Sequence, residues 1–225
     1  MRKLYPIFLL SIALVTIQEI SFAQGLKDYM KQKDRGLGVT YLQFKGFDTA
    51  KDDDGATATT DLKQKSAYAL STLIVGYNFP LVKVADHASF GVSPNLGMGL
   101  SWTNGTTIYG AIPVFATFKF GTDAVWSKSM AYESKLGFGL GIGYEFVGGV
   151  TNGPFETDMA GFSYLLPTAM AEISFVLSKK NLYRIRFQSN LVSSKSYEFT
   201  NTDELPAQVS FRQTSITFIK NFYAY

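Results

Sequence analysis

Two short runs in this 225-residue chain carry residues suited to chemistry, Asp86-His87-Ala88-Ser89 and Asp52-Asp53-Asp54-Gly55. An acid, a histidine and a serine are the groups of a nucleophilic site, because serine needs a base and the base needs an acid to orient it. Neighbouring residues on a turn or strand point apart, so Asp86 is poorly placed to orient His87. We therefore interpret His87 as an exposed turn residue and expect no enzyme.

The acidic run has the hard oxygen ligands that calcium prefers, but it lacks the EF-hand spacing, since Ala50 stands where the first ligand would be. We interpret it as a solvated loop, with weak divalent-ion bridging as a second hypothesis. One His and no Cys exclude histidine-cluster metal sites, thiol nucleophiles and cysteine-ligated clusters. We accordingly expect no metal and no cofactor.

The composition excludes two further classes. With 46% hydrophobic and 15% aromatic residues, the chain has enough apolar surface to fold and is not disordered. The net charge of +3, from 21 basic and 18 acidic residues, is too balanced for a nucleic-acid-binding protein. We expect no nucleic-acid partner.

The first 23 residues have the features of a secretory signal peptide. Arg2 and Lys3 precede a short apolar run, and the segment ends in Ser21-Phe22-Ala23. A transmembrane anchor is the alternative, but the run is short and Gln18 and Glu19 interrupt it. Residues 24–35 follow as a polar, partly basic segment, which we expect to form a short helix or an anchor at anionic headgroups.

The rest of the chain alternates with a period of two residues, which predicts an all-β domain over residues 36–225. In residues 88–102, for example, apolar side chains alternate with Gly, Ser and Asn. The Asn104-Gly105 pair is typical of a hairpin turn. The pattern predicts eight strands, near 36–47, 66–79, 88–102, 108–121, 130–147, 162–177, 182–194 and 208–225.

Two architectures produce this alternation. A soluble sandwich or lipocalin-like barrel turns its apolar faces inward, whereas an outer-membrane barrel turns them toward lipid. The faces opposite the apolar ones are rich in Gly and Ser and hold only isolated charges, and a water-facing surface would carry more Lys, Glu and Thr. The pattern therefore favours a membrane barrel, with the soluble barrel as its rival.

The signal peptide, the eight alternating strands and the aromatic end Ile219–Tyr225 resemble the small outer-membrane β-barrel proteins of the OmpA/OmpX/OmpW type. The resemblance implies an eight-stranded antiparallel transmembrane up-and-down β-barrel in the cell outer membrane. It also implies insertion by the barrel-assembly machinery, with both termini and residues 24–35 in the periplasm. Asn221 departs from the usual terminal signal, where an apolar residue is common. The pair His87 and Ser89 resembles the His-x-Ser arrangement of lipid A deacylases, but the surrounding residues do not match.

An eight-stranded barrel has an interior that side chains can fill. We expect Phe115, Tyr41, Tyr68 and Phe218 to point inward and to lie over rows of glycine, and a small ligand cavity is the alternative. Charges of both signs are also predicted on inward faces, including Arg212 and Lys220. Buried charges are tolerated only when paired, which predicts a structural salt-bridge network in the lumen. Its predicted members are Glu133, Lys135, Glu145, Glu172, Arg184 and Arg186.

A turn over Ser178–Leu182 would place Glu172 opposite Gln188 and diagonal to Arg186. A conduction path or gate is the functional alternative for these charges.

The favoured function is a monomeric, non-catalytic barrel with a structural or surface-interaction role, in contact with outer-membrane lipid and lipopolysaccharide. Surface interaction would use the predicted loops Asp48–Lys65, Gly148–Gly161 and Lys195–Ala207. The alternatives are a narrow channel or carrier for small or hydrophobic solutes and, less favoured, a lipid A-modifying enzyme. Fold alone does not decide among these functions.

Overall fold

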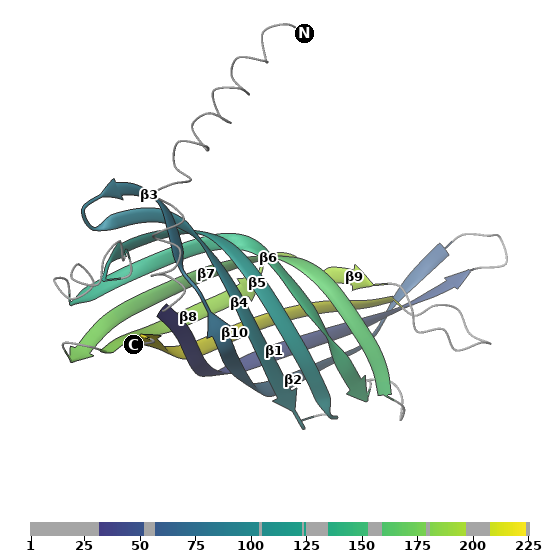
Figure 1. Ribbon diagram of the computed structural model, residues 1–225. Coiled ribbons are helices and arrows are strands. Elements are labelled where there is room, and N and C mark those ends of the chain that lie inside the picture. The colour runs from purple at the N-terminus through teal and green to yellow at the C-terminus, as the bar shows by residue number, and fades with distance from the viewer. Residues whose placement is uncertain are drawn as a thin grey trace, which may run out of the picture.

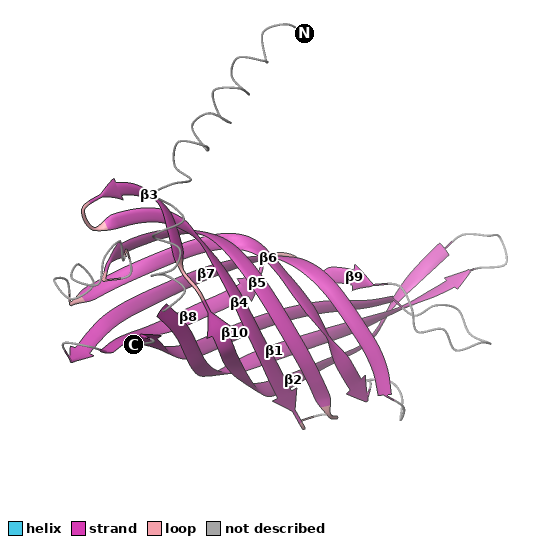
Figure 2. Cartoon of the chain, viewed as in Figure 1, coloured by secondary structure: helices cyan, strands magenta, loops and turns pink. Residues whose placement is uncertain are grey.

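The computed structural model describes residues 32–51, 57–103, 105–122, 124, 135–152, 159–178, 181–196 and 208–223. The signal peptide, residues 24–31, the acidic run Asp52–Asp54 and Glu133 lie outside the described residues. All regular secondary structure in the described part is strand (Figure 2). Within it, no helix is long and apolar enough to cross a membrane.

The strands form one antiparallel sheet that closes on itself, because β1 pairs with both β2 and β10 (Figure 1). The ten segments make eight barrel strands, since β3 continues β2 along β4 and β9 continues β8 along β10. The predicted eight-stranded antiparallel barrel is confirmed. The bounds are β1 Gln32–Lys51, β2 Thr57–Gly76, β3 Phe79–Ala85, β4 Ala88–Ser101, β5 Thr107–Gly121, β6 Leu136–Asn152, β7 Met159–Ser178, β8 Asn181–Asn190, β9 Ser194–Ser196 and β10 Gln208–Tyr223.

Several strands are longer than the sequence pattern predicts. β1 begins at Gln32 and not at residue 36, so Asp34 and Arg35 belong to the barrel. Residues 48–51 pair with residues 57–60, a threonine-rich stretch that suits a strand, and the predicted loop Asp48–Lys65 is therefore mostly hairpin. β6 and β7 likewise extend into the predicted loop Gly148–Gly161, and β3 occupies most of the predicted turn 80–87.

Both ends of the described chain lie at one end of the barrel, because Gln32 pairs with Tyr223. We call this the terminus end, and it is on the left in Figure 1. The opposite end, which carries the β1–β2, β4–β5 and β6–β7 connections, is called the loop end. At the β4–β5 connection Gly105 has a φ of 107°, a left-handed backbone conformation that fits the predicted hairpin turn.

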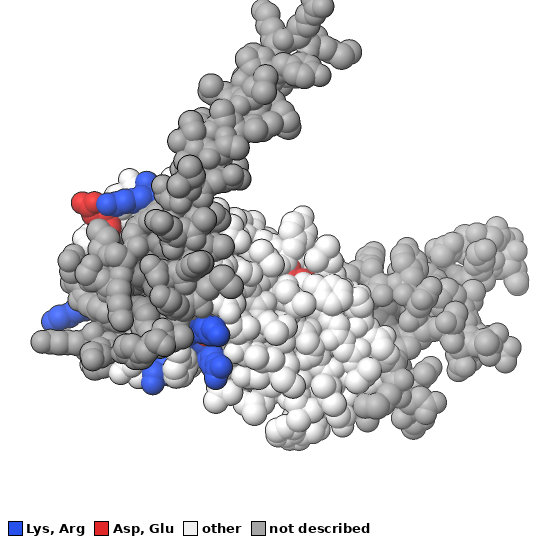
Figure 3. Space-filling view, viewed as in Figure 1, with Lys and Arg blue, Asp and Glu red and all other residues white. Residues whose placement is uncertain are grey.

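The outer surface of the barrel is apolar. Along β4, Phe90 and Met98 are exposed while Ser93 and Asn95 are buried. In β6 and β8, exposed apolar side chains likewise alternate with residues that are more buried. Figure 3 shows a broad surface almost without charge next to the terminus end, where Lys and Arg side chains gather. This is the orientation predicted for a membrane barrel, and it agrees with the predicted location in an outer membrane.

The prediction of which side chains point into the lumen was wrong for β1, β2 and β10. Phe115 points inward and is fully buried, as predicted, but Tyr68 and Phe218 are 63% and 48% exposed and lie on the outer surface. Tyr41 shares the outer face of β1 with the exposed Leu37 and Val39. These strands carry apolar side chains on both faces, so alternation alone does not identify the inner one. Arg212 and Lys220 lie on the outer face of β10 for the same reason.

Candidate functional site

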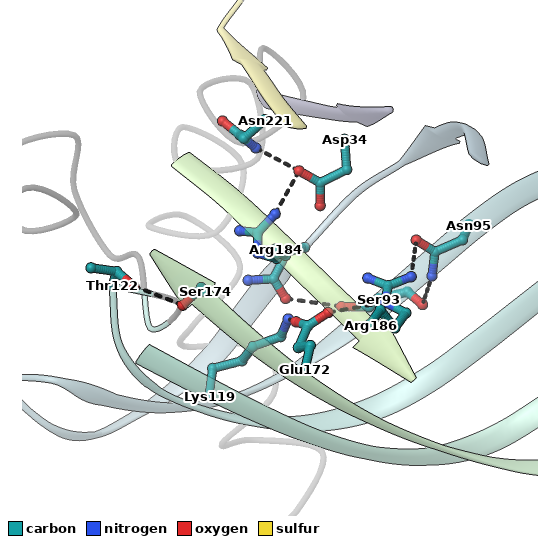
Figure 4. Close-up of polar contacts among 11 residues, drawn as sticks. Asp34, Ser93, Asn95, Lys119, Thr122, Glu172, Ser174, Arg184, Arg186 and Asn221 are labelled. Carbon is teal, nitrogen blue, oxygen red and sulfur yellow. Dashed lines mark hydrogen bonds and ion pairs between the residues drawn. The ribbon is translucent and has the colours of Figure 1, made fainter. Parts of the chain in front are cut away.

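The barrel interior near the terminus end holds a group of buried charges centred on Glu172. Glu172 on β7 lies directly across from Arg186 on β8, and Arg186 Nε donates to Glu172 Oε2 at 2.9 Å. The Lys119 ammonium from β5 forms an ion pair with the other oxygen, Oε1. Arg186 Nη1 also donates to Asn95 Oδ1 on β4 at 3.1 Å (Figure 4). Residues from four strands thus meet across the lumen around one carboxylate.

A second group lies at the seam where β1 meets β10. Arg184 Nη1 donates to Asp34 Oδ1 at 2.6 Å, and Asn221 Nδ2 donates to the same oxygen at 2.7 Å (Figure 4). All three side chains are buried. The group ties β8 to the first and last strands of the barrel, and Asn221 therefore has a partner that an apolar residue would lack.

Glu145 on β6 lies farther from the terminus end than Glu172 does, and its hydrogen-bond partners are uncharged. Its carboxylate accepts hydrogen bonds from Gln188 Nε2 at 2.8 Å, Asn190 Nδ2 at 3.3 Å and Thr168 Oγ1 at 3.4 Å. Amide and hydroxyl donors stabilise a buried carboxylate without neutralising its charge.

A small interior cavity of about 60 Å³ adjoins Glu145 and Arg186. Gln213 and Ser71 also line the cavity, and the atoms Gln213 Oε1 and Ser71 Oγ have no hydrogen-bond partner in the described structure.

Toward the loop end the interior becomes apolar and aromatic. The Tyr164 and Phe211 rings stack with centroids 5.0 Å apart and planes 2° apart. Phe44 packs on Phe211 at 5.1 Å, and Phe162 packs on both Phe44 and Phe211. We call Phe44, Phe162, Tyr164 and Phe211 the aromatic layer. Leu42 and Leu166, both buried, belong to the same cluster.

The structure places four of the six predicted network residues in the lumen, namely Glu145, Glu172, Arg184 and Arg186. Glu172 and Arg186 pair with each other, Arg184 pairs with Asp34, and Glu145 accepts hydrogen bonds from uncharged groups. The predicted register was wrong, because the connection after β7 is shorter and Ser178 pairs with Asn181. Lys135 is exposed, and Glu133 lies outside the described residues.

Sequence reasoning missed two members of these groups. Asp34 was assigned to the segment before the barrel, because the charged residues Lys33 and Arg35 on either side give this stretch no apolar alternation. Lys119, buried on the inner face of β5, was not assigned to an ion pair.

The run from Asp86 to Ser89 is not arranged as a nucleophilic site. Asp86 and His87 form the turn between β3 and β4, and the Asp86 carboxylate pairs with Lys83 Nζ at 2.7 Å. The hydrogen bond and charge of Lys83 hold the pKa of Asp86 below its ordinary value. Ser89 is buried on the inner face of β4 while Asp86 is exposed. No group of three or more metal-ligating side chains occurs in the part of the chain that the structure describes.

The chain is similar to solved barrel structures at low sequence identity. The Neisserial surface protein NspA has 8% identity and a TM-score of 0.43, with 86% of this chain and 97% of that chain covered. The outer membrane protein OprG from Pseudomonas aeruginosa has 10% identity and a TM-score of 0.46, with 86% and 96% covered. The outer membrane protease OmpT from Escherichia coli has 7% identity and a TM-score of 0.44, with 85% and 95% covered.

The sequence matches no protein-family model and no curated protein.

Proposed function

We propose that this chain is a non-catalytic β-barrel of the outer membrane whose lumen is filled by its own side chains, with a structural or surface-interaction role. The observation that carries the proposal is the pairing of the buried charges around Glu172 and Asp34 with partners from other barrel strands. Buried charges that pair with one another compensate each other and are not available to line a path for solutes.

The aromatic layer supports the same proposal. An ion that passed Phe44 and Phe211 would lose its water in an apolar setting, which is strongly unfavourable. The cavity of about 60 Å³ beside Glu145 is far smaller than a ligand pocket of several hundred Å³. The lumen thus has the features of a filled core.

Surface interaction would use the loop end. The hairpin of β1 and β2 extends beyond the barrel there (Figure 1), whereas residues 197–207 lie outside the described residues. The proposed contacts are outer-membrane lipid and lipopolysaccharide, with the barrel-assembly machinery acting during insertion, and the proposed state is a monomer.

A conductance measurement tests the filled lumen. The full chain, purified in detergent and shown to be folded by a shift in gel migration on boiling, is added to a planar bilayer. We expect no steady single-channel current. The double variant Phe44→Ala/Phe211→Ala, which removes part of the aromatic layer, is expected to pass more current than the wild type. Phe138→Ala is the matched control, because Phe138 faces outward from β6. Steady currents from the wild type would contradict the proposal.

The cavity beside Glu145 favours a narrow channel or carrier as the second candidate function. Uptake of small polar solutes into proteoliposomes would support it, and Glu145→Gln is the variant to compare, since Glu145 lines the cavity. A lipid A-modifying enzyme is a weaker candidate. It predicts that His87→Ala and Ser89→Ala alter the lipid A profile of cells, whereas we expect unchanged profiles.

A further inference from the structure

Two cations face each other on the outside of the barrel at the terminus end. Arg35 on β1 is the direct cross-strand partner of Lys220 on β10, and both side chains lie on the outer face. Like charges directly opposite each other destabilise an antiparallel pair. Neither side chain has an ion-pair partner among the described residues.

The position of this pair matches the level of lipid headgroups. Arg35 is three residues from the start of β1, about 10 Å along the strand. The next outward residues toward the loop end are Leu37 and Val39, which are 64% and 53% exposed. The pair therefore lies where the apolar band of the barrel begins.

An apolar groove of about 550 Å³ adjoins the two cations. Its walls include the exposed side chains Leu37, Ile74, Phe218 and Phe222, together with Arg35 and Lys220 themselves. A β-bulge helps to shape it: Asp34 pairs with Gly76 and Gly36 pairs with Leu73, so β2 has one extra residue at this point. Lys220 Nζ lies 5.0 Å from the centre of the Phe222 ring, which holds the ammonium at the edge of the groove.

We propose that this groove binds one anionic glycerophospholipid, with its phosphate between Arg35 and Lys220 and an acyl chain along the apolar walls. An anion between the two cations would relieve their repulsion, and the apolar walls distinguish a lipid from a free phosphate. The inference rests on the proposed membrane location but not on whether the lumen conducts.

Native mass spectrometry of the full chain in detergent tests the proposal, with phosphatidylglycerol and phosphatidylethanolamine of equal acyl chains as probes. The wild type is expected to retain phosphatidylglycerol preferentially. Arg35→Gln and Lys220→Gln are each expected to weaken its retention about fivefold, the effect of one basic residue at an anionic surface. Arg212→Gln is the matched control on the outer face of β10 near the loop end, and it is expected to change nothing.

Equal retention of the two lipids by the wild type would overturn the proposal, and this measurement needs no variant to fold. An equal loss in Arg212→Gln would overturn it as well. Displacement of phosphatidylglycerol by inorganic phosphate would show an anion site without lipid specificity, and preferential retention of lipid A would assign the groove to a different lipid. Either result would refute the assignment.

Discussion

Glu172 and Arg186 are direct cross-strand neighbours on the inner face of the barrel, joined by a 2.9 Å hydrogen bond between Nε and Oε2. Because Lys119 binds the other oxygen of the same carboxylate, one anion balances two buried cations. The free energy of unfolding should therefore depend strongly on Glu172.

Glu172→Gln is expected to lower the free energy of unfolding by about 3–5 kcal/mol, since it leaves buried cations without their counter-charge. Urea titration monitored by the gel shift on boiling measures the effect. Adding Lys119→Met should recover part of the loss, because it removes one of the two cations. A double variant no more stable than Glu172→Gln alone would show that the two side chains are not coupled.

Asp34 connects Arg184 to Asn221 at the closing seam of the barrel. Asp34→Asn removes the charge that faces Arg184, and we expect a loss of about 3 kcal/mol in the same urea titration. Arg212→Gln is the control, since Arg212 is exposed on the outer face of β10 near the loop end, away from the Asp34 pair; its effect should stay within about 0.5 kcal/mol. Equal losses in the two variants would contradict a specific role for the Asp34 pair.

The exposed pair Lys83 and Asp86 gives a prediction about pH. Because Lys83 lowers the pKa of Asp86 in the folded state, the stabilisation is present above the ordinary aspartate pKa and is lost as the pH falls through the lowered value. The effect on stability is small for so exposed a pair. NMR titration of the Asp86 carboxyl carbon should show a lowered midpoint that rises toward the ordinary value in Lys83→Met. A midpoint unchanged by that substitution would show that Lys83 is not the cause.

The sequence pattern predicted the barrel best where the two faces of a strand differ most. Residues 88–102 and 136–146 place large apolar residues on one face and mainly Gly, Ser or Asn on the other, so only one orientation fits a lipid environment. In β10 the same reasoning failed. Phe211 and Ile219 are buried in the lumen while Ile216 and Phe218 are exposed, so apolar residues occupy both faces.

The ion pairs were predicted only in part, because pairing depends on register. A difference of two residues in the connection after Ser178 decides whether Glu172 faces Arg186 or Gln188. Asp34 was missed for another reason: its flanking residues Lys33 and Arg35 make the segment look like a solvated stretch, and only closure of β1 on β10 turns Asp34 inward. Such long-range closure leaves no local signal in the sequence.

Gly99 and Tyr109 provide a test of how glycine shapes the interior. They are register partners on β4 and β5, and a Cβ atom built on Gly99 would overlap the Tyr109 ring, which is buried. Gly99→Ala should force the ring to move and lower the free energy of unfolding by about 1–3 kcal/mol in urea titration. Gly110→Ala is the matched control, because a Cβ there would meet nothing closer than 3.9 Å.

The cost of Gly99→Ala should shrink when Tyr109 is also changed to Ala, since the overlapping ring is then absent. If the cost is the same in both backgrounds, the glycine is needed for the backbone and not to accommodate the tyrosine.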